Sequence, residues 1–414
     1  MEEKLRFVFE YELGERSMTE LCQRYEVARE TGYVWLRRYR QTGVAGLTEH
    51  RRATHRHGNQ TPADLEQLVL ELRQAHMRWG PRKLKRVLER DEPGRVWPAT
   101  STIGALLKRE GLVVARKKRW RTAPYTAPLA HAYAANRVWC ADFKGWFRTA
   151  DRERIDPLTI SDAYSRYLLR CQAVEKTDTA RVQAIFEAAF REYGLPEALR
   201  TDNGPPFASR AIAGLSRLAV WWIKLGIVPE RIAAGHPEQN GRHERMHRTL
   251  KQEAAQPPAA HRREQQRALD RFLEEYNQVR PHEALQMQTP AEVYQPSART
   301  FPERVPEPEY PETMLVRSVR PQGNFRWKKH DVFLSEVLWG ERVGLLPEDD
   351  RWFTIYFAQF PLARFDSQKL QVTPLPKTGS FDTVAAGEGD AASPSPAVHP
   401  PTESDQKVSG MCPV

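Results

Sequence analysis

From about residue 135 onward, the chain alternates short apolar runs with longer amphipathic ones, and this alternation restricts the possible folds most strongly. The run RVWCADF, which begins at Arg137, is typical of a strand. The run PLTISDAYSRYLLRCQAV predicts two strands around a turn that contains Asp162. TARVQAIFEAAFREYG predicts an amphipathic helix that ends at Gly194. These segments together predict an α/β domain.

The same alternation continues to about residue 295. EALRTDNG predicts a short strand that ends in a turn at Asp202, and IVPERIA predicts another strand. Between them, SRAIAGLSRLAVWWIKLG is typical of a helix, and a further helix is predicted for GRHERMHRTLKQE. Residues 260–295 are predicted to be helical and then to form a loop. We therefore expect one domain over residues 135–295, with about five strands and several helices.

Residues 1–50 predict three short helices. In the second, Met18, Leu21, Cys22 and Tyr25 form one apolar stripe, and a brief turn leads to the basic helix RETGYVWLRRYRQTG. Two helices joined by a tight turn, the second of them basic, are typical of a DNA-binding helix-turn-helix. Many helical pairs that do not bind DNA have the same pattern. The candidate DNA contacts at the start of the basic helix are Arg29, Glu30, Tyr33 and Arg37.

Residues 61–115 predict a second helix-turn-helix domain, in which Thr61 and Ser101 are candidate helix caps and Pro81 is the first residue of a helix. A basic linker, residues 116–134, follows and begins with RKKRWR. This segment is either a solvated charge run or a strap that contacts DNA phosphates. Its candidate phosphate contacts are Lys117, Lys118 and Arg119.

The formal net charge of +10 suits a polyanionic partner, of which nucleic acid is the first candidate, although a merely basic protein would carry the same charge. Four cysteines without a CxxC pair indicate neither a disulfide framework nor a zinc ribbon. No stretch approaches the ~18 apolar residues that a membrane-spanning helix needs. No signal peptide is apparent either, so we expect a cytoplasmic, nucleoid-associated protein with no membrane partner.

The C-terminal part contains two segments of different composition. After a linker rich in Pro and Glu, short alternating runs over residues 314–376 predict a small SH3-like β-barrel. One such run places Phe353, Ile355 and Phe357 on a single face. Residues 377–414 are rich in Ser, Pro and Ala and lack the apolar residues that a core requires. We therefore expect a disordered tail.

Three acidic residues stand at informative positions. Asp142 lies inside an apolar strand, Asp202 ends a strand, and Glu244 lies in a helix. Taken singly, Asp202 is typical of a turn residue and Glu244 of a solvated helix residue. Taken together, the three carboxylates would repel one another unless divalent cations neutralised them, and oxygen ligands select Mg²⁺ or Mn²⁺. Two such ions support phosphodiester chemistry.

Four motifs follow one another in the sequence: WCADFKG, RTDNGPPF, GHPEQNGRHERMHRTLKQE and YNQVRPHEALQMQTPAEVY. They are similar to the motifs of DDE transposases of the integrase-like insertion-sequence group, which are related to retroviral integrases. RWGPRKLKRVL and the paired helix-turn-helix candidates also resemble this family. The resemblance spans about residues 15–295. It implies an RNase H-like core with a mixed five-stranded sheet, and a catalytic and metal-binding triad of Asp142, Asp202 and Glu244 that holds two Mg²⁺ ions, for which Mn²⁺ can substitute.

The chain departs from the family in two ways. The interval between Asp202 and Glu244 is longer than in retroviral integrases, and LSRLAVWWIKLGIVPERI accounts for the excess. The zinc-binding His/Cys domain of retroviral integrases has no counterpart in this sequence, where helix-turn-helix candidates take its place. Both departures leave the triad assignment in place.

Other polar residues near the triad have simpler interpretations. We expect Asp162 to be a turn residue, and Glu238 and Glu253 do not match the acidic position of the motif. Without an HExxH pattern, His236, His243 and His247 indicate contact with DNA or solvent rather than a zinc site. Arg248 and Lys251 follow Glu244 on one helical face, where they are candidate DNA contacts beside the acid.

These features predict a transposase. It would bind terminal inverted repeats through residues 1–125, cleave the 3′ ends of its element, and join them to target DNA by metal-dependent transesterification. The family also implies a homo-oligomer, at least a dimer, that pairs two DNA ends. Two alternatives remain: a domesticated helix-turn-helix regulator whose catalytic core is idle, and a structure-specific nuclease without strand transfer.

Overall fold

The computed structural model describes residues 2–48, 60–113, 131–231 and 241–375. The chain divides into two compact units, residues 1–71 and 72–414, and the boundary falls inside a helix, α4. The candidate contacts Lys117, Lys118 and Arg119 and most of the predicted linker lie outside the described residues, as does His236.

The first unit begins with three helices and a short 3-10 helix: α1 (Glu2–Glu12), α2 (Met18–Arg24), α3 (Arg29–Thr42) and η1 (Gly43–Leu47). Ser17 and Glu20 form a capping box that fixes the start of α2. Gly32 allows α3 to pack closely, because a Cβ atom there would lie 2.8 Å from the ring of Phe7. The α2–turn–α3 arrangement predicted from the apolar stripe is confirmed.

Three further helices follow: α4 (Ala63–Ala75), α5 (Pro81–Asp91) and α6 (Thr100–Arg109). Pro81 is the first residue of α5, as predicted, because proline lacks the N–H that the first turn leaves without a partner. The predicted cap at Ser101 is wrong, since this residue lies inside α6, which begins one residue earlier. The guanidinium group of Arg73 is buried and donates a 2.7 Å hydrogen bond to the carbonyl of Leu112.

The α/β part is built on one mixed sheet of six strands: β1 (Val138–Phe143), β2 (Phe147–Arg148), β3 (Arg154–Asp162), β4 (Leu168–Val174), β5 (Ala198–Thr201) and β6 (Val228–Arg231). β3 pairs antiparallel with β1, β2 and β4, whereas β5 pairs parallel with both β1 and β6. The prediction of five strands in a mixed sheet is therefore confirmed, with the two-residue β2 as an addition.

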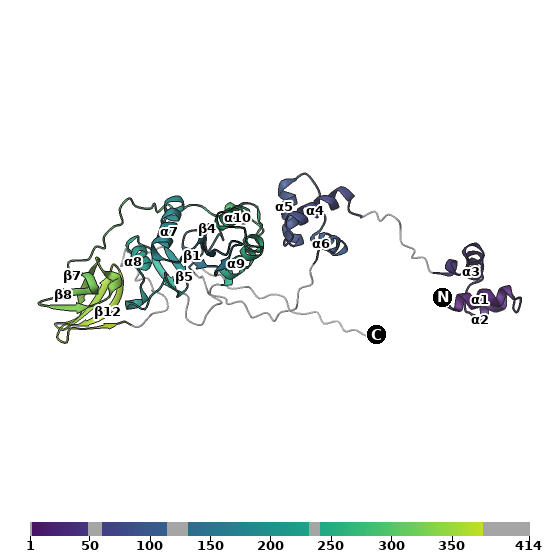
Figure 1. Ribbon diagram of the computed structural model, residues 1–414. Helices are drawn as coiled ribbons and strands as arrows, with labels where there is room; N and C mark the ends of the chain where they lie inside the picture. Colours follow the sequence, from purple (N-terminus) through teal and green to yellow (C-terminus); the bar gives the residue numbers. More distant parts are fainter. Residues whose placement is uncertain (1, 49–59, 114–130, 232–240, 376–414) are drawn as a thin grey trace, which may run out of the picture. The chain divides into compact units, whose positions relative to one another are not determined.

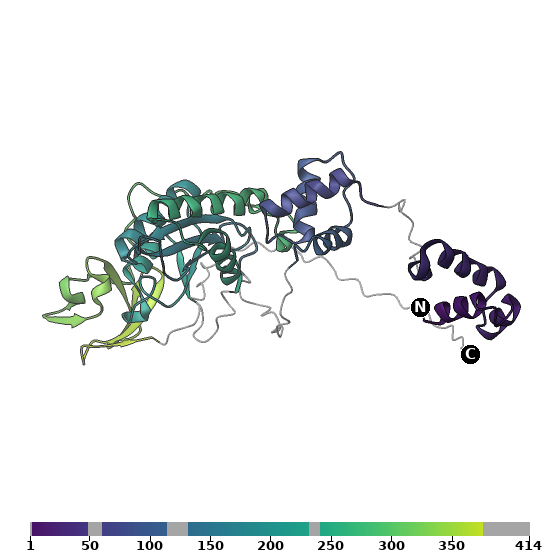
Figure 2. The ribbon, with the colours of Figure 1, turned by 45° about the vertical axis from the view of Figure 1, so that its right-hand side comes forward.

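Helices cover both faces of this sheet (Figures 1 and 2). α7 (Thr179–Tyr193) and α8 (Arg217–Lys224) pack on one face, where Phe186, Phe190 and Trp222 join the large core cluster. α9 (Gly241–Ala254) and α10 (Arg262–Glu274) pack against β4 on the other face. The chain then continues through the π-helix η4 (Glu275–Val279), the 3-10 helix η5 (Glu283–Leu285) and α11 (Pro290–Val293).

The helix predicted over SRAIAGLSRLAVWWIKLG forms only in its second half. The first half contains the short 3-10 helix η2 (Ile212–Gly214), and Gly214 has a φ of +70° that interrupts a regular helix. The hydroxyl of Ser216 then accepts a hydrogen bond from the N–H of Ala219 and caps α8. A local serine cap therefore sets the start of this helix.

The C-terminal part is an antiparallel sheet in the order β13–β12–β11–β10–β7, with a separate hairpin of β8 and β9. The strands are β7 (Leu315–Ser318), β8 (Asn324–Trp327), β9 (His330–Phe333), β10 (Arg342–Pro347), β11 (Trp352–Phe357), β12 (Phe360–Asp366) and β13 (Gln371–Pro374). Phe353, Ile355 and Phe357 are buried on one face of β11, as their alternation predicted. The predicted barrel closure is not found among the described strands, because the hydrogen-bonded ladder stays open at β7 and β13.

Across the described ranges, no helix combines the length and the apolar character that crossing a membrane requires.

Candidate active site

Two of the predicted catalytic acids lie at the carboxyl ends of two central strands of the mixed sheet. β1 and β5 run parallel, and Ala141 pairs with Thr201. Asp142 and Asp202 are each the next residue along their strand, so the sheet brings these two aspartates to neighbouring positions although they are far apart in the sequence. The pairing of β1 with β5, rather than a local motif, therefore places the two carboxylates beside each other.

The turn after β5 holds Asp202 in a half-buried position. The backbone N–H of Gly204 donates a hydrogen bond to the carboxylate, while burial, the larger effect, raises the pKa of Asp202. A Cβ atom on Gly204 would lie 2.9 Å from Oδ2, so glycine keeps this turn tight against the carboxylate. Oδ1 of Asp202 is buried, and no described residue donates a hydrogen bond to it. One carboxylate oxygen is thus left for a donor or cation from outside the described chain.

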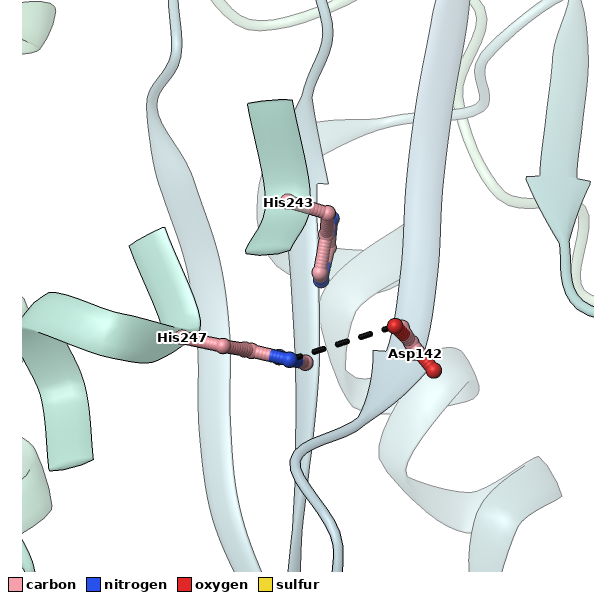
Figure 3. A group of neighbouring side chains, drawn as sticks. All are labelled: Asp142, His243 and His247. Atoms are coloured by element: carbon pink, nitrogen blue, oxygen red, sulfur yellow. Dashed lines mark ion pairs between the residues drawn. The ribbon is translucent and has the colours of Figure 1, made fainter. Parts of the chain in front are cut away.

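Two histidines of α9 face Asp142 across the site (Figure 3). Oδ2 of Asp142 lies 3.9 Å from Nδ1 of His247. His243 lies one turn earlier, with its ring nearly perpendicular to that of His247. In the described part of the chain, these three residues form the one group of three or more His, Cys, Asp or Glu side chains whose ligand atoms lie within 4.8 Å of one another.

The hydroxyl of Thr159 connects both histidines to the sheet. Thr159 is opposite Asp142 in the β1–β3 register, and its Oγ1 donates a 3.1 Å hydrogen bond to the carbonyl of Asp142. The same oxygen lies 2.7 Å from Nε2 of His243 and 2.7 Å from Nε2 of His247. One buried hydroxyl therefore fixes the position of α9 relative to β1 and β3.

Burial lowers the pKa of both histidines, to about 4 for His243 and to about 2 for His247. The ring of His243 and the ammonium group of Lys144 lower the pKa of His247 further. Both rings are neutral at pH 7. The predicted contact of His243 and His247 with DNA or solvent is wrong, because α9 turns this pair of residues toward the sheet and buries them.

The charged residues of α9 lie on a different face. Glu244, Arg248 and Lys251 are all exposed, as their spacing predicted. The structure does not bring the predicted triad together. Among the described residues, Asp142, Asp202 and Glu244 do not form a group whose ligand atoms all lie within 4.8 Å of one another. Lys144, which directly follows β1, has a pKa lowered mainly by burial and then by the positive charge of Lys251. Sequence reasoning did not single out Lys144 or Thr159, although Lys144 stands within the motif WCADFKG.

In the first unit, the structure exposes all four candidate DNA contacts of α3: Arg29, Glu30, Tyr33 and Arg37. The guanidinium group of Arg29 donates a 2.6 Å hydrogen bond to the hydroxyl of Thr19 on α2. This bond holds Arg29 across the two helices at the start of α3.

Family models match most of the described chain. Residues 132–237 and 225–290 match two models, each described as an integrase core domain. Residues 3–54 match a helix-turn-helix domain, and residues 31–107 match a homeodomain-like domain. Residues 132–290 therefore form an integrase core domain. The predicted resemblance to the integrase-like insertion-sequence group and the predicted helix-turn-helix domains are confirmed.

The relatives of this integrase-core protein include two from bacterial insertion elements. The IS407 uncharacterized 31.7 kDa protein of Burkholderia multivorans is 28% identical over 258 residues, which are 61% of this chain and 87% of that protein. The IS476 uncharacterized 39.2 kDa protein of Xanthomonas euvesicatoria is 29% identical over 275 residues, 65% of this chain and 76% of that protein. Among solved structures, the HTLV-2 integrase catalytic core in complex with magnesium is 17% identical, with a TM-score of 0.32, over 39% of this chain and 99% of that chain.

Proposed function

We propose that this chain is a DNA transposase, which binds the terminal inverted repeats of its element, cleaves the 3′ ends and joins them to target DNA. The observation that carries the proposal is the pair of aspartates at the end of β1 and β5 in an integrase core domain. The helix-turn-helix domains and the insertion-element relatives support the same function.

In this proposal, Asp142, Asp202 and Glu244 hold two Mg²⁺ ions, for which Mn²⁺ can substitute. The residues fit such ions, because the buried Oδ1 of Asp202 has no hydrogen-bond donor among the described residues and carboxylate oxygens are preferred ligands of Mg²⁺. Glu244 is exposed in the first turn of α9, next to His243, and would be the third carboxylate ligand, approaching the ions from the solvent side. When bound, two such ions activate an attacking oxygen and stabilise a leaving oxygen.

The remaining roles belong to cationic and helical residues. Arg248 and Lys251, which are exposed, and Lys144, which is partly buried, would hold the phosphates of the terminal DNA beside the acids. Thr159 and the two histidines would keep α9 fixed against the sheet while DNA binds. Base contacts would come from Arg29, Glu30 and Tyr33, with Arg37 as a further DNA contact, and phosphate contacts would come from Lys117, Lys118 and Arg119 in the linker.

Joining two ends of an element requires two end-binding units, so we propose a homo-oligomer that is at least a dimer. A protein that acts on the DNA of a bacterial insertion element would work in the cytoplasm, at the nucleoid.

The test is to incubate the full chain with DNA of the element's end, a supercoiled plasmid and Mg²⁺. Nicking at the 3′ end and joined plasmid products are expected, and chelation of Mg²⁺ should remove both. Specific end binding without any cleavage would instead indicate a DNA-binding regulator. Cleavage without joined products would indicate a nuclease.

A further inference from the structure

The hydrogen bonds of Thr159 determine which nitrogen of His247 carries a proton. A hydroxyl group has one hydrogen, and Thr159 donates it to the carbonyl of Asp142 at 3.1 Å. The two histidine contacts at 2.7 Å must then be N–H groups that donate to the hydroxyl oxygen. Nε2 therefore carries the hydrogen in both rings.

The same geometry leaves Nδ1 of His247 with a lone pair directed at the site. Nδ1 lies 3.9 Å from Oδ2 of Asp142, and Figure 3 shows the ring and the carboxylate facing each other. Two electron-pair donors thus face each other with no hydrogen available from the ring to bridge them.

A metal ion fits this separation. Nitrogen and carboxylate ligands lie ~2.0–2.2 Å from a tetrahedral Zn²⁺ and therefore ~3.3–3.6 Å from each other, so a small side-chain rotation brings the two atoms from 3.9 Å to the spacing that one ion requires. Asp142 stands on β1, and His247 is held against β3 by a buried hydroxyl, so both donors are already fixed in the metal-free protein. Such preorganisation lowers the cost of binding.

We propose that Oδ2 of Asp142 and Nδ1 of His247 together bind a divalent transition-metal ion. An imidazole nitrogen favours Zn²⁺ over Mg²⁺, which prefers oxygen ligands only. His243 acts as a positioning residue, since its Nε2–H shares the Thr159 oxygen with His247. The site shares Asp142 with the triad of the proposed function but needs neither Asp202 nor Glu244, so Zn²⁺ bound there would compete with Mg²⁺ for one carboxylate.

The experiment measures metal binding to the full chain without DNA, so that phosphate oxygens cannot serve as ligands. One equivalent of Mn²⁺ is added as a paramagnetic probe, and electron spin-echo modulation detects directly bound ¹⁴N. Zn²⁺ affinity is measured by calorimetry in parallel. Wild-type protein should show ¹⁴N coupling, and His247→Gln should lose the coupling and weaken Zn²⁺ binding at least about tenfold.

The matched control is His330→Gln, which replaces an exposed histidine on β9 and should change neither quantity. Wild-type protein that binds Mn²⁺ without ¹⁴N coupling would overturn the proposal, whether or not His247→Gln folds. So would coupling that survives in a folded His247→Gln. Asp202→Asn and Glu244→Gln should keep the coupling. If these two variants also kept full cleavage activity, the proposed triad would be refuted, whereas the proposal that His247 is a metal ligand would still be supported.

Discussion

Strand β3 ends with a buried aspartate, Asp162, and the turn after β5 holds a half-buried one, Asp202, yet the protein treats the two carboxylates differently. Both oxygens of Asp162 are occupied: Oδ1 accepts hydrogen bonds from the N–H and hydroxyl of Ser165 at 2.7 and 2.6 Å, and Oδ2 accepts one from the N–H of Asn136 at 2.8 Å. Asp202 receives one from Gly204, and its buried Oδ1 receives none from the described residues.

Burial raises the pKa of both aspartates, so burial alone does not distinguish a structural carboxylate from a candidate ligand. The hydrogen-bond donors make the distinction. The hydrogen-bonding capacity of Asp162 is met by donors from its own chain, as expected for a residue that stabilises a turn. Asp202 retains an oxygen to which no described residue donates a hydrogen bond, as expected for a residue that binds a ligand.

The largest expected effect tests the ligand side of this comparison. Asp202→Asn should lower 3′-end cleavage and joining by more than about a hundredfold, because it removes a proposed metal ligand and hardly changes volume. Binding of terminal DNA should persist. Asp142→Asn and Glu244→Gln should behave in the same way. Cleavage by Asp202→Asn at the wild-type rate, measured with Mg²⁺ on end DNA, would refute the triad.

The structural side is tested by Asp162→Asn. An asparagine side chain offers one acceptor oxygen, so its NH₂ group would face a donor from Ser165 or Asn136 in a buried turn. We expect the free energy of unfolding to fall by about 2–4 kcal/mol, because each buried group left without a partner costs about 1–3 kcal/mol. Asp202→Asn should change it by less than about 1 kcal/mol. Urea unfolding of both variants compares them, and equal losses of stability would remove the distinction.

Divalent metal should sharpen the same comparison. Mg²⁺ that binds only the folded chain stabilises it by about 2.7 kcal/mol when its concentration is about a hundred times the dissociation constant. The wild type and Asp162→Asn should both gain this stability, whereas Asp202→Asn should gain little. Unfolding across a Mg²⁺ series measures the gain, with Ca²⁺-free buffer and a chelator as the blank. An equal gain in Asp202→Asn would locate the bound metal elsewhere.

The smallest effect concerns a cation on the outer face of α9. Lys251→Ala should weaken the positioning of terminal DNA and lower the salt slope of binding by about 0.9, which is the contribution of one phosphate contact. The Mg²⁺ concentration for half-maximal cleavage should hardly move, because Lys251 is not a proposed metal ligand. Arg263→Ala, on α10, is the matched control. An unchanged salt slope would make Lys251 a solvated lysine.

The sequence predicted those parts of the molecule that local chemistry determines. Strand alternation located β1, β3 and β4, and the order of the motifs singled out Asp142 and Asp202 as candidate acids. The failures have nonlocal causes. The face of α9 that carries His243 and His247 is buried because β3 places Thr159 beneath it, and no pattern within the helix encodes that partner. Closure of the C-terminal strands likewise depends on pairing between edges, which alternation within each strand does not specify.

The pairing of β1 with β5 has a consequence for how such proteins diverge. The relative position of Asp142 and Asp202 is set by the ladder between Val138–Ala141 and Ala198–Thr201, not by the number of residues that connect the strands. Insertions and deletions outside the ladder can therefore accumulate without separating the two carboxylates. A lineage can lengthen its connections and acquire new surfaces for DNA or partner copies while its chemistry stays in place.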